Sequence, residues 1–408
     1  MKDSLPKLRP DVDVMPSPVP GQPGLLLRDP FLYTNDILVI PPPWVALLQC
    51  LDGEHSVLDA QSLLTRLSGG QVVARSDLEQ FVAILTQSGF IESDELDRLK
   101  QQRHDEFRRA SVREPTHAGS AYPGDATAIE SRFSSEQLFR SRDSKTASPI
   151  AVAAPHVSPE GGFASYRAAY DLPRLVKPTT FVILGTSHYG APERFGTSAK
   201  PFQTPLGRAE VDHDALSDFV SRAGEAVIEE DYCHRAEHSI EFQVLFLQYH
   251  FDQPFRILPI LCGPFVESLT TGKPPESRDG NRRVFDALAE LHVRRDDLVW
   301  ILGVDMAHIG TRYGHRDPAR ASEGVMVQVA EHDRRRLDRI CGGDSEGFFD
   351  LVHPGGDELN WCGYSPMYTF LRSVGSAVKL KGEVRSYEQW NIDQGSVVTF
   401  GALHFSAG

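Results

Sequence analysis

The chain has 408 residues, and 42 Lys and Arg against 56 Asp and Glu give a formal net charge of -14. This acidic balance excludes a dedicated nucleic-acid binder, which needs a basic surface to neutralise phosphates. No stretch reaches the roughly 18 apolar residues that a membrane-spanning helix requires. The first residues lack the apolar core of a secretory signal, and five scattered cysteines do not form a disulfide framework. We therefore expect a cytoplasmic, thiol-reduced protein of two or three domains with no nucleic-acid or membrane partner.

The N-terminal part predicts a small folding unit followed by a charged connection. Residues 1–24 are rich in proline, and we expect them to form an extended lead-in. Residues 25–92 combine two short apolar runs typical of strands with three helical patterns, which predicts a small α+β domain. Residues 93–112 are densely charged, with Leu96, Leu99 and Phe107 on one helical face. They predict a connecting helix with a solvated surface.

Residues 113–408 follow a different pattern, in which short runs of Val, Ile and Leu alternate with helical segments. The apolar runs are at residues 150–153, 181–184, 257–261 and 298–302. Continuous apolar strands separated by helices are typical of a mostly parallel sheet that is covered on both faces. The expected fold class is therefore α/β, with an αβα layered domain behind the small N-terminal one.

Three histidines come directly after these predicted strands, namely His156, His188 and His308. In open α/β sheets, ligands bind beyond the carboxyl ends of the strands, where side chains from several strands converge. A lone histidine at a strand end is more often a capping or hydrogen-bonding residue, so the interpretation depends on the three together. His156 and His188 are separated by about one strand–helix–strand step, and two neutral imidazoles on neighbouring strands can share zinc, iron or copper.

Other polar residues could complete such a site. Asp305 lies three residues before His308 and could orient its ring, or could simply cap a turn. Cys362 precedes a predicted helix whose N-terminus would favour a thiolate, which suits a nucleophile or a metal ligand, although most single cysteines are packing residues. Glu237 and His238 open an apolar helix and could line the pocket edge or cap the helix.

Taken together, these motifs resemble the Memo family. The resemblance covers roughly residues 113–405, and its motifs occur in the order of that family: THAGSAY at 116–122, APH at 154–156, ILGTSH at 183–188, EHSIE at 237–241, VDMAH at 304–308 and CG at 362–363. Prokaryotic members are named component B of the AmmeMemoRadiSam system. The resemblance implies radical SAM and AMMECR-type proteins of the same system as partners.

The resemblance also implies a fold similar to that of class III extradiol dioxygenases and a set of site residues. By position, His156, His188 and Cys362 would be metal ligands for iron or copper, with zinc as a further candidate. Asp305 and His308 would line the same pocket, with His308 as the acid/base residue. Residues 157–160, VSPE, depart from the usual pattern of the family, and Glu160 could add a carboxylate to the pocket.

The N-terminal domain is similar to the winged-helix-like peptide-chaperone modules of PQQ biosynthesis. The similarity rests on LDGEHSV at 51–57 and LTQSGFI at 85–91. It implies that residues 25–92 bind a peptide or recruit a partner enzyme, and a structural spacer is the alternative.

Three functional hypotheses follow. The first is a Memo-type metalloprotein with a mononuclear site that could be redox-active. The second is a non-haem iron dioxygenase-like or hydrolytic enzyme with His308 as base. The third is a non-catalytic, peptide-binding adaptor. Class III dioxygenases place a carboxylate where this chain has Cys362, so we expect metal binding without cleavage of simple catechols.

Overall fold

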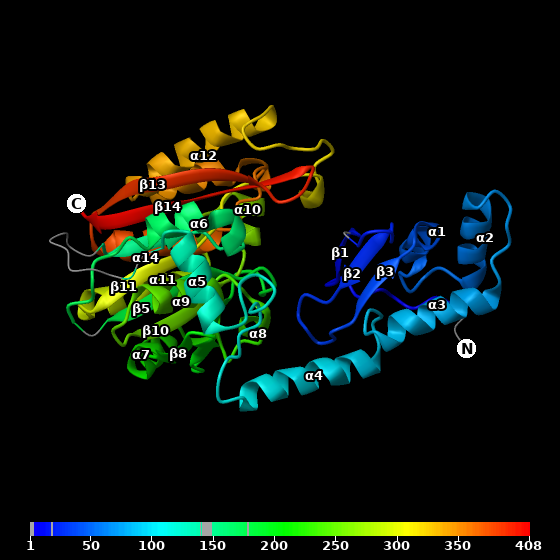
Figure 1. Ribbon diagram of the computed structural model, residues 1–408, viewed down its shortest axis with the longest axis horizontal. Helices are drawn as coiled ribbons and strands as arrows, with labels where there is room; N and C mark the ends of the chain where they lie inside the picture. Colours follow the sequence, from blue (N-terminus) through cyan, green and yellow to red (C-terminus); the bar gives the residue numbers. More distant parts are fainter. Residues whose placement is uncertain (1–3, 18, 139, 141–148, 178) are drawn as a thin grey trace. The chain divides into compact units, whose positions relative to one another are not determined.

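The computed structural model describes residues 4–17, 19–138, 140, 149–177 and 179–408, and it divides into two compact units. The first unit is Met1–Arg109 and the second is Ala110–Gly408 (Figure 1). Among the described residues, no helix is long and apolar enough to cross a membrane. The second unit begins close to the start of the predicted α/β domain.

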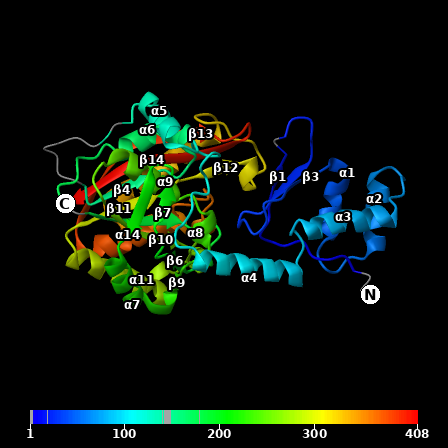
Figure 2. The same cartoon turned by 60° about the horizontal axis from the view of Figure 1, so that its bottom comes forward.

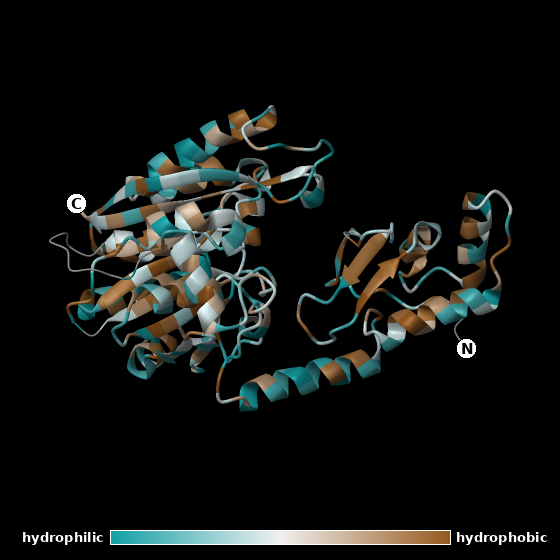
Figure 3. Ribbon diagram, in the orientation of Figure 1, coloured by the Kyte–Doolittle hydropathy of each residue, from teal (hydrophilic) through white to brown (hydrophobic). Residues whose placement is uncertain are grey.

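The first unit is a small antiparallel sheet with helices. The sheet has the order β1 (Asp13–Pro16), β2 (Leu25–Arg28) and β3 (Ile37–Ile40). Its helices are α1 (Pro42–Val45), a 3-10 turn at Ala46–Cys50, α2 (Val57–Leu67), α3 (Arg75–Gln87) and α4 (Asp94–Arg109). The apolar strands β2 and β3 are brown in Figure 3, and their side chains pack with those of the helices in one core. The two predicted strands and three helical patterns of residues 25–92 are present.

The structure differs from the sequence-based expectation at residues 1–24, where β1 lies inside the expected lead-in. Val14 pairs with Leu27 of β2, so the pairing partner supplies the backbone hydrogen bonds that hold this short segment extended. The strand was not predicted because the prolines around β1 are typical of an irregular segment. The predicted connecting helix is α4, whose residues are mostly hydrophilic in Figure 3, while Leu96 and Phe107 are buried.

The second unit is built around a mixed sheet that has eleven strands in the described residues. Its centre is formed by four parallel strands in the order β4 (Ala151–Ala154), β11 (Leu298–Gly303), β5 (Thr180–Thr186) and β10 (Arg256–Cys262). These are the four predicted strands, and nearly all of their residues are buried, which is why they read as continuous apolar runs. The predicted α/β class is confirmed.

Further strands extend the sheet on both sides. On one side, β14 (Ser396–Ala407) runs antiparallel to β4 and pairs with β13 (Leu380–Asn391) and β12 (His308–Gly310). The other side is formed by β6 (Phe195–Thr197), β7 (Phe202–Thr204), β8 (Gly207–Val211) and β9 (Val227–Glu229). These strands were not predicted, because most are only three to five residues long.

Helices cover both faces of this sheet. In Figure 2, α7 (His213–Ala223), α11 (Asp279–Arg294) and α14 (Tyr364–Ala377) gather along one side, and α5 (Ala126–Ser135) and α6 (Pro159–Ala169) lie on the other. The remaining helices are α8 (Cys233–Ala236), α9 (Glu241–His250), α10 (Val266–Thr271), α12 (Val325–Cys341) and α13 (Ser345–Val352). The unit is therefore an αβα layered domain.

The register of the central strands brings three chain segments to one edge. Ala154 of β4 pairs with Gly303 of β11, and Gly303 pairs with Gly185 of β5. Because these strands are parallel, the residues that follow them emerge side by side at the carboxyl edge. His156, His188 and Asp305 all lie within three residues of these paired positions.

Candidate metal centre

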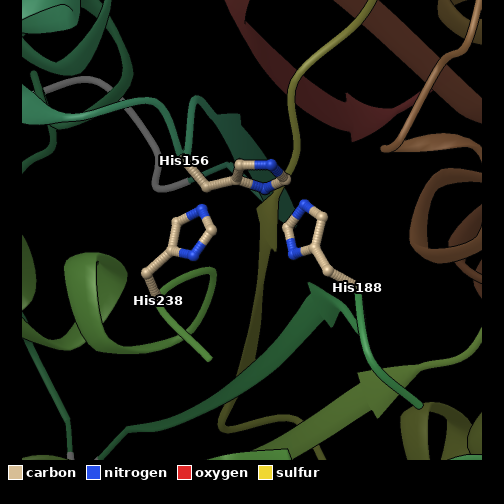
Figure 4. Close-up of side chains that lie close together, drawn as sticks. All are labelled: His156, His188 and His238. Atoms are coloured by element: carbon tan, nitrogen blue, oxygen red, sulfur yellow. The ribbon is translucent and has the colours of Figure 1, made fainter. Parts of the chain in front are cut away.

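Three imidazole rings converge at the carboxyl edge of the sheet. His156 follows β4, His188 follows β5, and His238 precedes α9. One nitrogen from each ring lies within 4.8 Å of the others, and the ring centroids are 5.0–5.2 Å apart. Figure 4 shows the three rings pointing toward one another. Imidazole nitrogens at this separation can share one transition-metal ion after a small inward movement.

His156 is the most deeply buried of the three, at 2% exposure. Its Nδ1 lies 2.9 Å from the carbonyl oxygen of Gly303. A carbonyl only accepts, so Nδ1 carries a proton, and Nε2 is the nitrogen that faces the cluster and could bind a metal once it has no proton of its own. Asp305 fixes the backbone beside the ring, because its Oδ1 accepts from the N–H of His156 at 2.9 Å.

His188 is oriented by a buried carboxylate. Its Nδ1 lies 2.9 Å from Oε2 of Glu237, and its backbone N–H donates to Oε1 of the same side chain. A carboxylate on one ring nitrogen fixes the tautomer and makes the other nitrogen a stronger donor to a metal. The side chains of His188 and His238 are 26% and 28% exposed, so the cluster is open to solvent on their side.

The thiol of Cys362 belongs to the same cluster, since its Sγ lies 3.2 Å from Nε2 of His156. Two bonds fix the backbone around it: Gly363 N–H donates to the Asp305 carbonyl at 3.0 Å, and the Thr186 hydroxyl donates to the Cys362 carbonyl at 3.0 Å. The structure thus brings together the three residues expected to bind metal.

The electrostatics of the cluster favour a thiolate. Burial opposes the charged form, but the positive charges of His156 and His308 and hydrogen bonds from His156 and His188 lower the pKa of Cys362 to about 5. Burial would likewise lower the pKa of His156, yet Asp305 and Cys362 raise it to about 9. Without metal, the two side chains therefore form a thiolate–imidazolium pair, whose protons a metal ion would displace.

The other two histidines differ in charge. Burial opposes protonation of His188, but Glu237 and Cys362 hold its pKa well above the usual value. His238 has a pKa well below the usual value, because burial and the neighbouring positive charges of His188 and His156 both disfavour its protonation. His238 is thus a neutral imidazole that needs no deprotonation to bind a metal.

Asp305 and His308 occupy different places relative to the cluster. Asp305 is buried, and its Oδ2 lies 3.6 Å from Nε2 of His156. His308 begins β12, is half-buried, and has Nδ1 3.0 Å from the carbonyl of Met306. Its ring packs edge-on against Tyr313, with the centroids 4.9 Å apart. His308 is close enough to Cys362 to stabilise its thiolate, and a catalytic role for it stays a prediction.

Glu160 lies at a different cavity. Its side chain is exposed on α6 and lines a hollow of about 370 Å³ together with Tyr122, Pro159 and Phe163. None of the three clustered histidines lines this hollow. Its expected contribution of a carboxylate to the pocket remains a prediction.

The EHSIE motif at 237–241 contributes more to the site than we predicted from the sequence. We expected His238 only to line the pocket, whereas its ring is the third member of the histidine cluster. Glu241 is fully buried and accepts from Arg113, from the N–H groups of residues 116 and 117 at 3.0 Å, and from the Tyr122 hydroxyl at 2.6 Å. Glu241 therefore anchors the 116–122 loop. His117 of that loop packs edge-on against His238, with the centroids 5.6 Å apart.

Comparisons with known proteins give the family to which the sequence is similar. A sequence model described as Memo-like protein matches residues 113–404. A MEMO1 family protein from Aquifex aeolicus is 22% identical over 90% of this chain and 91% of its own length. One from Thermococcus onnurineus is 32% identical over 58% and 79%, and one from Methanosarcina barkeri is 27% identical over 72% and 99%.

Proposed function

The chain belongs to the Memo-like protein family, and on that premise we propose that its second unit binds one mononuclear metal ion through His156, His188 and Cys362. The observation that carries the proposal is the convergence of donors from separate segments of the chain at the carboxyl edge of the sheet. Three imidazoles lie within 4.8 Å of one another, and a thiol lies 3.2 Å from one of them. Imidazole and thiolate together suit copper, zinc or iron bound by sulfur, and do not suit magnesium or calcium.

We propose His238 as the residue that decides whether the site is closed or open. With His238 bound, the ion would have three nitrogens and one sulfur, and so all four positions filled by protein, as in structural zinc sites. With His238 unbound, one position would remain for a substrate or water, as in catalytic sites. The opening toward solvent at His188 and His238 favours the second arrangement.

The chemistry proposed for this site is that of an iron or copper centre, with zinc as the alternative. When bound, the ion supplies Lewis-acid or one-electron redox chemistry. The chain supplies an oriented imidazole at His156, a second at His188, and a thiolate that donates charge to the ion. In a dioxygenase-like or hydrolytic reaction, His308 would hold or release a proton next to the bound substrate, which its half-buried position near Cys362 allows.

The test is elemental analysis of protein purified anaerobically without a metal-affinity column. We expect close to one equivalent of iron, copper or zinc in the wild type. His156→Ala should lose most of it, because His156 is the most buried donor. His332→Ala, which removes an exposed histidine of α12 outside the cluster, is the control and should retain the metal. Equal metal content in both variants would refute the proposal.

We further propose that the first unit recruits a peptide or a partner protein, such as the radical SAM or AMMECR-type proteins of an AmmeMemoRadiSam system. The supporting observation is the edge strand β3, whose residues Ile37–Ile40 carry no charge and whose Ile37 is 58% exposed. An uncharged edge strand can accept a peptide as an additional strand. Ile37→Lys should abolish co-purification of a co-expressed partner, whereas Val14→Lys on the opposite edge should not.

A further inference from the structure

Asp333 is a fully buried carboxylate on α12. It accepts three hydrogen bonds, each 2.7 Å long. Trp361 Nε1 donates to Oδ1, and the hydroxyls of Tyr387 and Thr399 both donate to Oδ2. A buried carboxylate is tolerated when its oxygens are saturated in this way. Each of the three donors belongs to a different segment, so Asp333 joins three parts of the chain.

The first of these bonds reaches the segment that carries Cys362. Trp361 directly precedes Cys362, and its buried indole is held at the N–H by Asp333. The Trp361 backbone N–H donates to Asp357 at 2.6 Å. The guanidinium of Arg336, one turn after Asp333 on α12, lies 5.4 Å from the centre of the ring. Trp361 is therefore held at three points: Asp357 at its backbone, Arg336 over its ring face, and Asp333 at its indole N–H.

The second bond reaches the segment that carries Asp305 and His308. The Thr399 hydroxyl gives its one proton to Asp333 and accepts from the N–H of Ala307 at 2.8 Å. The Thr399 backbone adds two bonds, from Met306 N–H at 2.8 Å and to the Ala307 carbonyl at 2.9 Å. Residues 306 and 307 are thus hydrogen-bonded to Thr399. Asp333 orients the Thr399 hydroxyl that accepts from Ala307.

We propose that Asp333 is a positioning residue for the metal centre, tying the Cys362 segment through Trp361 and the Asp305–His308 segment through Thr399 to one helix. These two segments meet at the site, where Gly363 N–H donates to the Asp305 carbonyl at 3.0 Å. Asp305 also accepts from the N–H of His156 at 2.9 Å, so a shared anchor behind the two segments helps to set the distance between the thiol of Cys362 and the ring of His156. The effect on metal affinity rests on the proposed function, whereas the effect on the two segments does not.

The test compares Asp333→Asn with Tyr387→Phe as matched control. Asparagine keeps the shape but has one acceptor oxygen, so at least one of the two branches loses its acceptor. Tyr387→Phe also removes a hydrogen bond to Asp333, but on β13, which carries neither segment. In metal-free protein, amide hydrogen exchange at 305–308 and 360–363 should be about tenfold faster in Asp333→Asn than in the control. Equal exchange at these segments in both variants would overturn the proposal.

A second pair of variants tests one branch alone, and remains informative if Asp333→Asn does not fold. Thr399→Val removes the linking hydroxyl and should accelerate exchange at 305–308 while leaving 360–363 unchanged. Thr399→Ser keeps the hydroxyl and should restore the slow exchange. Faster exchange spread evenly over α12, β13 and β14 in both variants would show a general loss of stability. It would refute the claim that the Thr399 hydroxyl specifically holds residues 305–308.

Zinc affinity provides the functional readout, measured by competition with a chromophoric chelator. Asp333→Asn should bind zinc about tenfold more weakly than Tyr387→Phe, the usual loss when an outer partner of a metal ligand is removed. Equal affinities would overturn the positioning role at the metal. A wild-type protein that binds no zinc, iron or copper would refute the proposed function instead, and the exchange experiment would still decide whether Asp333 holds the two segments.

Discussion

Replacing Glu237 by Gln should weaken metal binding without unfolding the second unit. In the structure, one oxygen of Glu237 accepts from Nδ1 of His188 at 2.9 Å and the other accepts from the His188 backbone N–H. Glutamine has one acceptor oxygen and one N–H₂ group. If the oxygen stays on the backbone N–H, the amide donor faces Nδ1 and forces the proton onto Nε2, which then cannot bind a metal.

The size of this effect follows from the bonds that are lost. A hydrogen bond to a charged group contributes about 1.5–3 kcal/mol. Outer partners of ligating histidines typically change metal affinity by about 10–100-fold, which corresponds to ~1.4–2.7 kcal/mol. The two ranges overlap. Both apply here because the Glu237 side chain is 1% exposed, so water screens its bond to His188 little. We therefore expect a loss of about 10–100-fold.

The assay is competition for zinc with a chromophoric chelator, with thermal unfolding of the metal-free protein measured in parallel. Glu193→Gln is the matched control, because Glu193 is also buried and accepts from one backbone N–H, of Glu267, and one side-chain N–H₂, of Asn281. It should destabilise the unit similarly and leave zinc affinity unchanged. Unchanged zinc affinity in Glu237→Gln, or an equal loss in both variants, would refute the assigned role of Glu237.

Three further predictions follow from the structure. Arg113→Met should lower the free energy of unfolding by ~3–5 kcal/mol in urea titrations, because it leaves Glu241 buried without its counter-ion. The control Arg222→Met breaks the solvent-exposed ion pair with Glu290 and should lower it by less than ~1 kcal/mol. Equal losses in the two variants would contradict the prediction. In metal-free protein, alkylation of Cys362 should stay fast down to about pH 5 and slow below it, since its thiolate persists above a pKa of about 5. Burial raises the pKa of Cys341 to about 11, so Cys341 should react slowly at pH 7. Peptide mass spectrometry after timed labelling measures both rates, and the same pH dependence for the two cysteines would contradict the charge assignment. His308→Ala should keep nearly all of its metal, because no nitrogen of His308 belongs to the cluster, and loss of metal comparable to that of His156→Ala would make it a ligand.

The central strands and two histidines of the site could be predicted from sequence for one physical reason. Buried parallel strands have no polar face, so β4, β5 and β11 appear as apolar runs and the first polar residues after them mark the carboxyl edge. His156 and His188 are such residues. The short strands β6 to β9 have too few residues for a pattern, and β13 is exposed or half-buried along most of its length.

His238 could not be placed in this way, because its position depends on tertiary packing. It precedes α9 instead of following a strand. Its segment is held at the sheet edge by Ser239, whose hydroxyl donates to the Thr186 carbonyl at 2.7 Å, and by Gln243, which donates to the Pro155 carbonyl at 2.9 Å. Both bonds join residues more than fifty positions apart, and the sequence alone does not identify such pairs.

X-ray absorption at the edge of the bound metal tests the thiolate-containing site most directly. The measurement would use anaerobically purified wild type and Cys362→Ala. We predict one sulfur scatterer at about 2.3 Å with nitrogen scatterers at about 2.0–2.1 Å in a zinc-loaded wild type. The sulfur shell should disappear in Cys362→Ala while the nitrogen shell remains. A wild-type spectrum with nitrogen and oxygen scatterers alone would contradict the account, because the metal would then sit on the histidines without Cys362.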